Sequence, residues 1–424
     1  MYALVDCNSF FCSVEKVFHP GLAGKPVCVL SGNDGIIVAL TPEAKAIGLH
    51  RGDALFKVRE TVERENVAVF SGNIMLYSAM SKRIVSILRQ SVHHVESYSI
   101  DECFCDLTGY ENHYDLTGYM RDVAQRIKLW TDIPVSIGIA PTKTLAKMGS
   151  KYAKNYRGYR SVCTIDSEEK RRKALEMFDL GDIWGLGRRT CEKLLSLGIR
   201  TPLDFADRNA AWVRSHLTKP GVQTWMELNG RPCIDTAEML QRQTIRTCRS
   251  FGEMVTSLTQ LKPAVASFAA SCACTLRSQR SVAGAVTVFL CSNRFREDLE
   301  QYWNCDTIRF RVPTADTIEI TAAALRLLPG IYRAGIRYKK AGVILSCISP
   351  DNAVQQILFD DVPDRPERMS LARTMDQINH KFGLKSVSLA VECAGPASPT
   401  WKPKCGWKSH NYLTDINDLL TIDV

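Results

Sequence analysis

The feature that most constrains this chain is an acidic pair between two short apolar segments. Residues 95–100 and 103–107 are apolar or β-branched enough to form strands, and Asp101 and Glu102 fall between them, at the turn of a predicted hairpin. Two-residue hairpin turns favour Asn-Gly, Asp-Gly or Gly-X because they need positive φ, so an acidic pair gains nothing conformationally there. A solvated polar turn is the ordinary explanation for such a pair.

A third carboxylate favours a different interpretation. Asp6 ends the apolar run of residues 2–5, and if that strand neighbours the hairpin, three carboxylates meet at one edge of a sheet. Such a cluster repels itself unless cations lie within it, and carboxylate oxygens suit Mg²⁺. The sequence therefore predicts a Mg²⁺ site formed by Asp6, Asp101 and Glu102.

Length, cysteine spacing and charge limit the class of protein. A chain of 424 residues is too long for one core and predicts two to four domains. The 16 cysteines are scattered without a C-x-x-C pair, so neither a zinc site nor a disulfide framework is expected. No run of 18 apolar residues predicts a membrane span, and Asp6 argues against a signal peptide. We expect a cytoplasmic protein with reduced thiols.

The basic charge is concentrated in one segment. The formal net charge is +9, and residues 241–350 carry 15 Lys and Arg against 7 Asp and Glu, an excess of eight. A local basic surface favours polyanions, although a merely solvated basic face is the alternative. The order of elements predicted there is βαββαβ, a ferredoxin-like arrangement, and Arg246, Arg249, Arg309 and Arg311 alternate with apolar positions, as expected if one sheet face follows a phosphate backbone.

The first 165 residues read as an α/β layer with a mixed sheet and helices on one face. A helix is expected over 9–18, where Phe10 fits a core position equally well and Phe11 is expected to face the acidic site. An insertion with a helix from Pro42 to Ile47 carries Lys45, and a single lysine is more often solvated than functional.

Two further motifs carry positive charge or backbone N–H groups. Lys143, Lys147, Lys151 and Lys154 share one face of a predicted helix; such a stripe is usually solvated, but beside a metal site it also suits a phosphate chain. In the mainly helical segment 166–232, Gly185 and Gly187 precede Arg188, Arg189 and a helix ended by Gly198. A Gly-hydrophobic-Gly turn that opens a helix presents N–H groups to an anion, which predicts a helix–hairpin–helix on a nucleic-acid phosphate.

After Pro350 regular periodicity is lost. Residues 355–359 place an apolar pair in an acidic, Pro-rich stretch. Exposed motifs of this kind dock into partner pockets, and the alternative is a local cluster that covers the preceding domain.

These motifs together resemble the Y-family, or translesion, DNA polymerases, over essentially the whole chain. The most specific matches are residues 6–11 (DCNSFF), 98–102 (YSIDE), 141–147 (PTKTLAK) and 184–187 (WGLG). Within the family the chain is most similar to the branch that contains the catalytic subunit of bacterial DNA polymerase V. Residues 409–420 of this chain resemble the C-terminal tail of that branch.

The resemblance implies a right-hand polymerase made of α/β and α+β domains. It implies a mixed-sheet palm, small fingers, a helical thumb with a helix–hairpin–helix and a ferredoxin-like little finger, followed by a tail. The expected bounds are 1–10 and 72–165 for the palm, 11–71 for the fingers, 166–232 for the thumb, 241–350 for the little finger and 351–424 for the tail.

The resemblance also implies site residues. Asp6, Asp101 and Glu102 match the carboxylates that hold two Mg²⁺ ions, with the Cys7 carbonyl as a further ligand. Phe11 matches the steric gate that rejects a ribose 2′-OH, with Phe10 beside it in the nucleotide site, and Lys154 matches a triphosphate-binding lysine. Two departures lie in the fingers: many members have an aromatic residue and an arginine where this chain has Pro42 and Lys45. A lysine keeps the charge but not the bidentate fork.

The implied partners are primer–template DNA and deoxynucleotides, the sliding clamp (the beta subunit of DNA polymerase III), a processed UmuD dimer and RecA. Gln355, Leu358 and Phe359 match the anchors of the clamp-binding peptide. No second acidic cluster suggests a proofreading exonuclease, so we expect error-prone synthesis past damaged bases by a nucleoid-associated cytoplasmic enzyme.

Two other functions fit parts of the sequence. A nucleotide cyclase shares a palm-like sheet and metal carboxylates but lacks a helix–hairpin–helix and a basic βαββαβ domain. A clamp- and DNA-bound scaffold without catalysis is the second, and the intact trio Asp6, Asp101 and Glu102 argues against it.

Overall fold

The computed structural model describes residues 1–235, 242–355, 357–358, 360, 362–383, 385–393 and 403–419. The chain divides into two compact units, one formed by Met1–Met239 with Gly406–Val424 and the other by Leu240–Cys405. Among the described residues, no helix has both the length and the apolar content needed to span a membrane.

The first unit contains the mixed sheet that the sequence predicts. Its five strands lie in the order β5, β6, β1, β7, β8, with β1 antiparallel to β6 and β7, and β7 parallel to β8. Their bounds are β1 Tyr2–Cys7, β5 His94–Ser97, β6 Glu102–Asp106, β7 Val135–Ala140 and β8 Val162–Thr164. The predicted hairpin is confirmed, but its turn is Tyr98–Asp101, and Glu102 is the first residue of β6.

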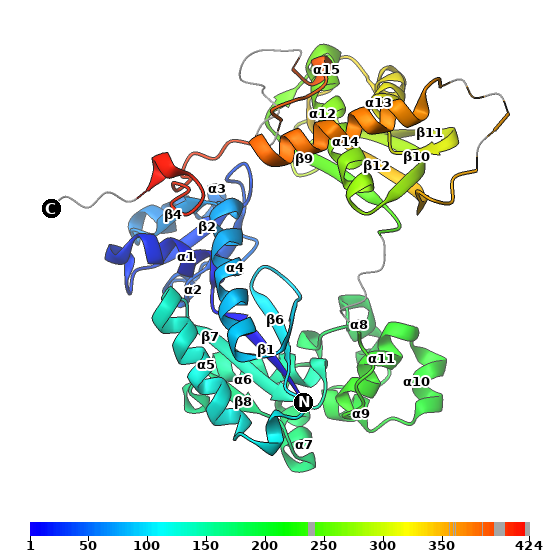
Figure 1. Cartoon of the computed structure of the whole chain (residues 1–424). Helices are drawn as coiled ribbons and strands as arrows, with labels where there is room; N and C mark the ends of the chain where they lie inside the picture. Colours follow the sequence, from blue (N-terminus) through cyan, green and yellow to red (C-terminus); the bar gives the residue numbers. More distant parts are fainter. Residues whose placement is uncertain are drawn as a thin grey trace. The chain divides into compact units, whose positions relative to one another are not determined.

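Helices cover both faces of this sheet, so the prediction of helices on one face is wrong. The helices α1 (Phe10–Phe18), α4 (Ile74–Ser91) and α5 (Leu116–Thr131) pack on the face that carries Val5 and Ile137 (Figure 1). The helix α6 (Lys143–Asn155) packs on the other face, against Leu4 and Phe104. Successive side chains of β1 are apolar on both faces, and a strand of this kind must be covered on both.

A smaller three-stranded sheet lies between α1 and α4 in the sequence. Its order is β3, β2, β4, with β2 and β4 parallel. Its elements are β2 Val27–Leu30, β3 Ile37–Leu40, α2 Pro42–Ala46, α3 Leu55–Arg64 and β4 Ala68–Ser71. The predicted helix after Pro42 is confirmed, and Gly48 follows it at φ +89.

The segment that follows β8 is helical, as predicted. It contains α7 Glu168–Met177, α8 Arg188–Ser196, α9 Pro202–Ala206, α10 Ala210–His216 and α11 Lys219–Leu228. The turn before α8 requires glycine at 185, because φ there is +94 and a Cβ atom would lie 2.2 Å from the Oγ1 atom of Thr224. A short 3-10 helix, Leu180–Asp182, precedes this turn.

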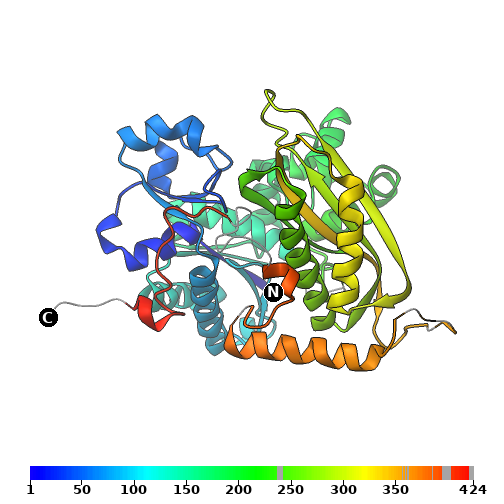
Figure 2. The ribbon, with the colours of Figure 1, turned by 90° about the horizontal axis from the view of Figure 1, so that it is seen from above.

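The second unit confirms the predicted βαββαβ order. Its elements are β9 Ile245–Val255, α12 Leu258–Ser278, β10 Ser281–Cys291, β11 Trp303–Thr314, α13 Thr317–Ile331 and β12 Tyr338–Pro350. The sheet order is β11, β10, β12, β9, with every pair antiparallel. The helices α12 and α13 lie side by side over one face, where they enclose the core (Figure 2).

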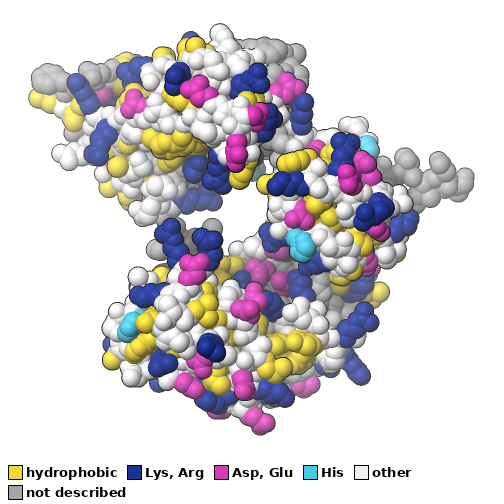
Figure 3. Space-filling model, turned by 180° about the vertical axis from the view of Figure 1, so that it is seen from behind, with side chains coloured by type: hydrophobic (Ala, Val, Ile, Leu, Met, Phe, Trp, Pro, Cys, Tyr) yellow, Lys and Arg dark blue, Asp and Glu magenta, His cyan; other side chains and the backbone are white. Residues whose placement is uncertain are grey.

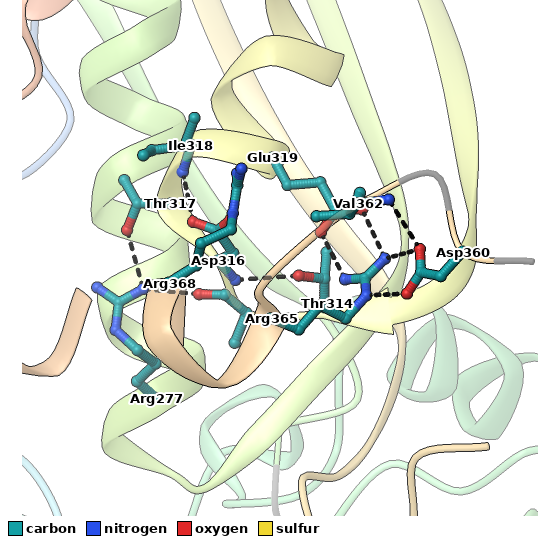
Figure 4. Close-up of polar contacts among 11 residues, drawn as sticks. Arg277, Thr314, Asp316, Thr317, Ile318, Glu319, Asp360, Val362, Arg365 and Arg368 are labelled. Carbon is teal, nitrogen blue, oxygen red and sulfur yellow. Dashed lines mark hydrogen bonds and ion pairs between the residues drawn. The ribbon is translucent and has the colours of Figure 1, made fainter. Parts of the chain in front are cut away.

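The tail adds a long helix that the sequence analysis does not predict. The helix α14 (Arg365–Phe382) is attached to the βαββαβ core mainly through arginines, which Figure 4 shows in part. Arg277 of α12 donates two hydrogen bonds to the carboxylate of Asp376, at 2.6 and 2.8 Å. Arg368 donates to Asp316 at 2.5 Å, and Arg365 donates to Glu319 at 2.9 Å. A further short helix, α15, covers Ala390–Cys393.

Candidate active site

Asp6 and Glu102 lie directly opposite each other in neighbouring strands. They are register partners of the antiparallel pair β1–β6. Directly opposed residues project from the same face of a sheet with Cβ atoms roughly 5 Å apart, and residues two positions further along each strand, Leu4 and Phe104, pack on the α6 face. Both carboxylates therefore face α6.

The helix α6 brings two lysines to these carboxylates. The Nζ atom of Lys154 lies 2.7 Å from Oδ1 of Asp6, and that of Lys147 lies 3.0 Å from Oε1 of Glu102. The helix lies close to β7 at Gly138, where a Cβ atom would be 2.0 Å from the carbonyl oxygen of Ala146. The lysine stripe is thus not merely solvated.

The remaining two lysines of the stripe also bind carboxylates. Lys143 is buried and lies 2.8 Å from Glu96, and Lys151 contacts Asp182. All four lysines of α6 are therefore paired with acidic groups from other elements.

Burial perturbs the two opposed carboxyl groups. Loss of hydration raises the pKa of Asp6, while Lys154 lowers it and the charge on Asp101 raises it. Burial likewise raises the pKa of Glu102 against the effect of Lys147. In both carboxyl groups desolvation outweighs the neighbouring lysine, so the pKa is raised overall.

Asp101 is close in sequence to Glu102 but differently oriented. Its backbone oxygen accepts a hydrogen bond from the N–H of Cys7 at 2.9 Å, and its carboxylate accepts one from the hydroxyl of Ser99 at 2.6 Å. Across the described ranges, no group of three or more His, Cys, Asp or Glu side chains is arranged to hold a metal ion. Lysines contact Asp6 and Glu102 and Ser99 contacts Asp101, while the charge of Asp101 is close enough to raise the pKa of both Asp6 and Glu102. The Mg²⁺ site expected from these three carboxylates stays a prediction.

A cavity of about 1020 Å³ opens beside the opposed pair, and we call it the carboxylate cavity. Its acidic wall contains Asp6, Glu102 and Asp182. Its basic wall contains Lys45, Arg51, Lys147, Lys151 and Lys154. Arg51 is missed by sequence reasoning, because a lone arginine in a glycine-containing loop carries no local signal; only folding of the small sheet brings it here.

The two phenylalanines of α1 occupy different environments. Phe10 is 3% exposed and belongs to the hydrophobic core, so we leave it out of the nucleotide site. Phe11 is half-buried and its ring stacks on Tyr77, with centroids 4.5 Å apart. Neither ring is part of the lining of the carboxylate cavity.

The predicted DNA-contact residues are mostly exposed. Gly187 is the N-cap residue of α8, and Arg188 and Arg189 follow it on the surface. Arg188 lies 3.6 Å from Glu192, one turn along α8.

Three of the four arginines of the second sheet share one face. Arg246 is paired in register with Ile344, and Arg309 with Ala285, on the face that the helices leave uncovered. Arg311 lies two residues beyond Arg309 and shares its face. Arg249, three residues from Arg246, is opposite the core residue Ala341 and lies on the helix side. The prediction of a single face is therefore wrong for Arg249.

The excess of Lys and Arg side chains is not separated from the acidic side chains on every face of the protein. On the face that Figure 3 presents, Lys and Arg side chains are interspersed with Asp and Glu. The predicted clamp anchors are exposed where the structure describes them: Leu358 is 91% exposed and Gln355 is also exposed. Phe359 lies outside the described residues.

Comparison with known proteins agrees with this architecture. The impB/mucB/samB family model matches residues 5–151, its C-terminal domain model matches 242–358, and a domain of unknown function (DUF4113) matches 369–422. Protein UmuC of Salmonella typhimurium strain LT2 is 38% identical over 424 residues, which is 100% of both chains. DNA polymerase IV of Dehalococcoides mccartyi is 28% identical over 90% of this chain and 95% of its own.

Solved structures share the fold. A chimera of the Y-family DNA polymerases Dbh and Dpo4 superposes with a TM-score of 0.65 at 22% identity, over 82% of this chain and 99% of the chimera. Identity this low shows the fold alone, whereas the full-length match to UmuC shows the family. The chain therefore belongs to the impB/mucB/samB family, the UmuC-like members of the Y-family of DNA polymerases.

Proposed function

We propose that the carboxylate cavity is the site of nucleotide addition in template-directed, error-prone translesion DNA synthesis. The observation that carries this proposal is the opposed pair Asp6 and Glu102 in a cavity with five basic side chains. A deoxynucleoside triphosphate with its cations needs both kinds of group: carboxylate oxygens for the cations and ammonium or guanidinium groups for the phosphates.

The donor set fits the divalent cations that this family uses. We assign Asp6, Asp101 and Glu102, with the carbonyl group of Cys7, to two Mg²⁺ ions. The Nζ atoms of Lys147 and Lys154 form ion pairs with carboxylate oxygens of Glu102 and Asp6, respectively, and a divalent cation would bind these same oxygens. When bound, the ions activate the primer 3′-hydroxyl and stabilise the charge of the leaving pyrophosphate.

The chain's own residues then bind and orient the substrate. Lys45, Arg51 and Lys154 line the cavity and neutralise the triphosphate, whose negative charge grows on the leaving group during transfer. Pro42, where many family members have an aromatic residue, lines the cavity but offers no N–H group. Phe11, half-buried against Tyr77, serves as the steric gate that excludes a ribose 2′-hydroxyl.

DNA is held outside the cavity by backbone and arginine contacts. We assign Gly185, Gly187, Arg188 and Arg189 to one DNA backbone phosphate, because a helix N-terminus with exposed arginines favours an anion. Arg246, Arg309 and Arg311, which share the uncovered sheet face, bind further phosphates. Arg249 is excluded from this surface by its position.

The partners follow from the exposed motif and from family membership. The 91% exposed side chain of Leu358 supports docking of Gln355, Leu358 and Phe359 to the sliding clamp. Partnership with a processed UmuD dimer and with RecA, and a nucleoid location, rest on the similarity to UmuC. The palm, fingers, thumb, little finger and tail bounds given above are part of this proposal.

Primer extension past a template abasic site in Mg²⁺ tests the proposed site. The wild-type protein is compared with the Asp101→Ala, Glu102→Ala double variant, each with and without clamp and accessory subunits. A matched control removes two carboxylates from exposed positions of α3, Glu60→Ala and Glu63→Ala. We expect extension by wild type and control and none by the double variant. Equal extension by all three would overturn the site, and no wild-type extension under any condition would favour a scaffold.

A further inference from the structure

A buried carboxyl group that the proposed catalysis does not use lies on α1. Glu15 is 0% exposed, and its Oε1 atom accepts hydrogen bonds from the hydroxyl groups of Tyr77 at 2.6 Å and Ser409 at 3.0 Å. Burial of a carboxyl group costs free energy unless hydrogen bonds compensate it. The two hydroxyls come from segments more than 300 residues apart in the sequence, so Glu15 joins α1, α4 and the C-terminal end of the chain.

The C-terminal partner belongs to residues 406–419, which we call the C-terminal strap. The strap lies along the first unit (Figure 1), where Ser71 at the end of the edge strand β4 donates its N–H to the carbonyl of Trp407 at 2.9 Å. The N–H of Gly406 donates to Asp34 at 2.6 Å, and the ring of Tyr412 stacks on Phe18 of α1. The strap is thus fixed at both sides of Ser409.

The strap also holds the start of α4. Asn73 is the N-cap residue of α4 and is fully buried; its side-chain oxygen accepts from the N–H of Leu76. The amide nitrogen of Asn73 donates to the carbonyl oxygens of Ser409 at 3.0 Å and His410 at 3.3 Å. Because Tyr77 is one helical turn beyond the N-cap, the strap fixes both the backbone that carries Tyr77 and the acceptor of its hydroxyl.

Tyr77 in turn supports Phe11. The two rings are stacked, with 4.5 Å between centroids and an angle of 18° between planes, and Tyr77 is 0% exposed. Because Tyr77 is fully buried and is held at both its hydroxyl group and its backbone, it restricts the position of the half-buried Phe11 ring that stacks on it.

We propose that the C-terminal strap sets the position of Phe11 through Ser409, Glu15 and Tyr77, and thereby sets how strongly the enzyme rejects ribonucleotides. This inference rests on the proposed role of Phe11 as the sugar gate. Ser409, Glu15 and Tyr77 are positioning residues in it. The strap falls within the part of the chain that matches a domain of unknown function, and this assigns a role to that part.

The test measures discrimination, the ratio of kcat/KM for a deoxynucleotide to that for the matching ribonucleotide, on undamaged primer–template with the full chain and its required partners. Ser409→Ala and Tyr77→Phe each remove one hydroxyl and keep every ring in place. We expect each to lower discrimination about five-fold, the size of one lost hydrogen bond, while kcat for deoxynucleotides changes less. Ser370→Ala, a serine-to-alanine change on an exposed position of α14, is the matched control and leaves discrimination unchanged.

A second comparison separates the strap from the gate. Phe11→Ala alone should lower discrimination far more, and Ser409→Ala added to Phe11→Ala should lower it no further. If Phe11→Ala acts but Ser409→Ala and Tyr77→Phe do not, the strap has no such role and the gate stands. If Phe11→Ala leaves sugar selection unchanged, the proposed gate is wrong and the inference with it. An undiminished effect of Ser409→Ala in the Phe11→Ala background would also overturn it.

Discussion

Two helices of this chain, α6 and α14, bring basic side chains against carboxylates, and they do so with different chemistry. On α6, Lys154 contacts Asp6 and Lys147 contacts Glu102, at the wall of a cavity of about 1020 Å³. Each ammonium group is a compact point charge on a flexible stem. Such a group can move aside when a better cation reaches the carboxylate.

Between α14 and its domain the same electrostatic pairing is made by guanidinium groups, both of α14 itself and of Arg277 on α12. Arg365 donates to Glu319 at 2.9 Å and to both oxygens of Asp360, and Arg277 binds both oxygens of Asp376. A planar fork that binds a carboxylate through two N–H groups fixes its geometry. Arginine therefore attaches α14 to its domain, whereas the cavity carboxylates are paired with lysines, which lack the planar fork.

The largest expected effect comes from an Asp→Asn substitution made once in the carboxylate cavity and once at the attachment of α14. Asp6→Asn should reduce the rate of primer extension by about a thousand-fold. The variant would bind the divalent cation poorly and lose several kcal/mol of transition-state stabilisation by that cation. Asp316→Asn should leave extension within a few-fold but weaken the attachment of α14, because the Asp316 carboxylate accepts a hydrogen bond from Arg368. Single-turnover extension and hydrogen exchange of residues 365–382 measure the two effects.

One result would contradict this difference between the carboxylate cavity and the attachment of α14. If Asp6→Asn destabilised the first unit as strongly as Asp316→Asn destabilises the second, the Asp6–Lys154 pair would be structural. We expect the opposite, since the pKa of Asp6 is raised chiefly by burial, and a neutral amide at this position removes the cost of desolvating the charge.

The α6 side of this contrast could be foreseen in part from local patterns. The apolar run before Asp6, the hairpin around the acidic pair and the four lysines of residues 143–154 all carry period-two or period-four signals. The carboxylate signals predicted a shared site for Asp6, Asp101 and Glu102, whereas the lysine stripe left a solvated face and a phosphate-binding face both open. These signals did not predict that α6 covers the second sheet face, because period-two patterns do not reveal which helix covers which face.

Other parts of the molecule carry no local signal strong enough to predict them. The helix α14 is an exception that was missed, because Asp364, Pro366 and Glu367 at its start and Gly383 after its end are ordinary helix signals. Arg51 reaches the cavity, and Ser409 reaches Glu15, only through contacts distant in sequence. Arg249 was assigned to the wrong face because a spacing of three residues reverses side in a strand.

A second prediction tests the guanidinium fork itself. Arg277 is 7% exposed at its side chain and also donates to Ala315 and Thr317. Arg277→Lys keeps the charge but loses most of these bonds, and we expect the opening free energy of α14 to fall by about 2 kcal/mol. Hydrogen exchange of residues 365–382 measures it. Arg373→Lys, at an exposed pair 3.7 Å from Asp351, is the matched control and should change it by less than about 0.5 kcal/mol.

A third prediction moves the arginine chemistry into the cavity. Lys154→Arg should bind Asp6 through two N–H groups and compete with the divalent cation, so the Mg²⁺ concentration for half-maximal extension should rise about five-fold, since the guanidinium fork holds a carboxylate more firmly. Lys151→Arg introduces the same side chain next to Asp182 and should leave the Mg²⁺ dependence unchanged. Equal Mg²⁺ curves for wild type and Lys154→Arg would show that Lys154 does not compete with the metal.

The smallest expected effect is a pH dependence confined to α14. Hydrogen bonds from Arg365 and from the N–H of Val362 lower the pKa of Asp360 to about 2, below the unfolded value of about 3.9. Because the pKa of Asp360 is lower in the folded state, its charge stabilises the folded protein at pH values above the pKa of the unfolded state. This stabilisation is lost as the pH falls toward 2. The melting temperature of Asp360→Asn should therefore lie slightly below that of wild type at pH 6, and the gap should narrow as the pH falls from 4 to 3. A gap independent of pH would mean that the Asp360 charge does not hold α14, and the attachment would then rest on Glu319, Asp316 and Asp376.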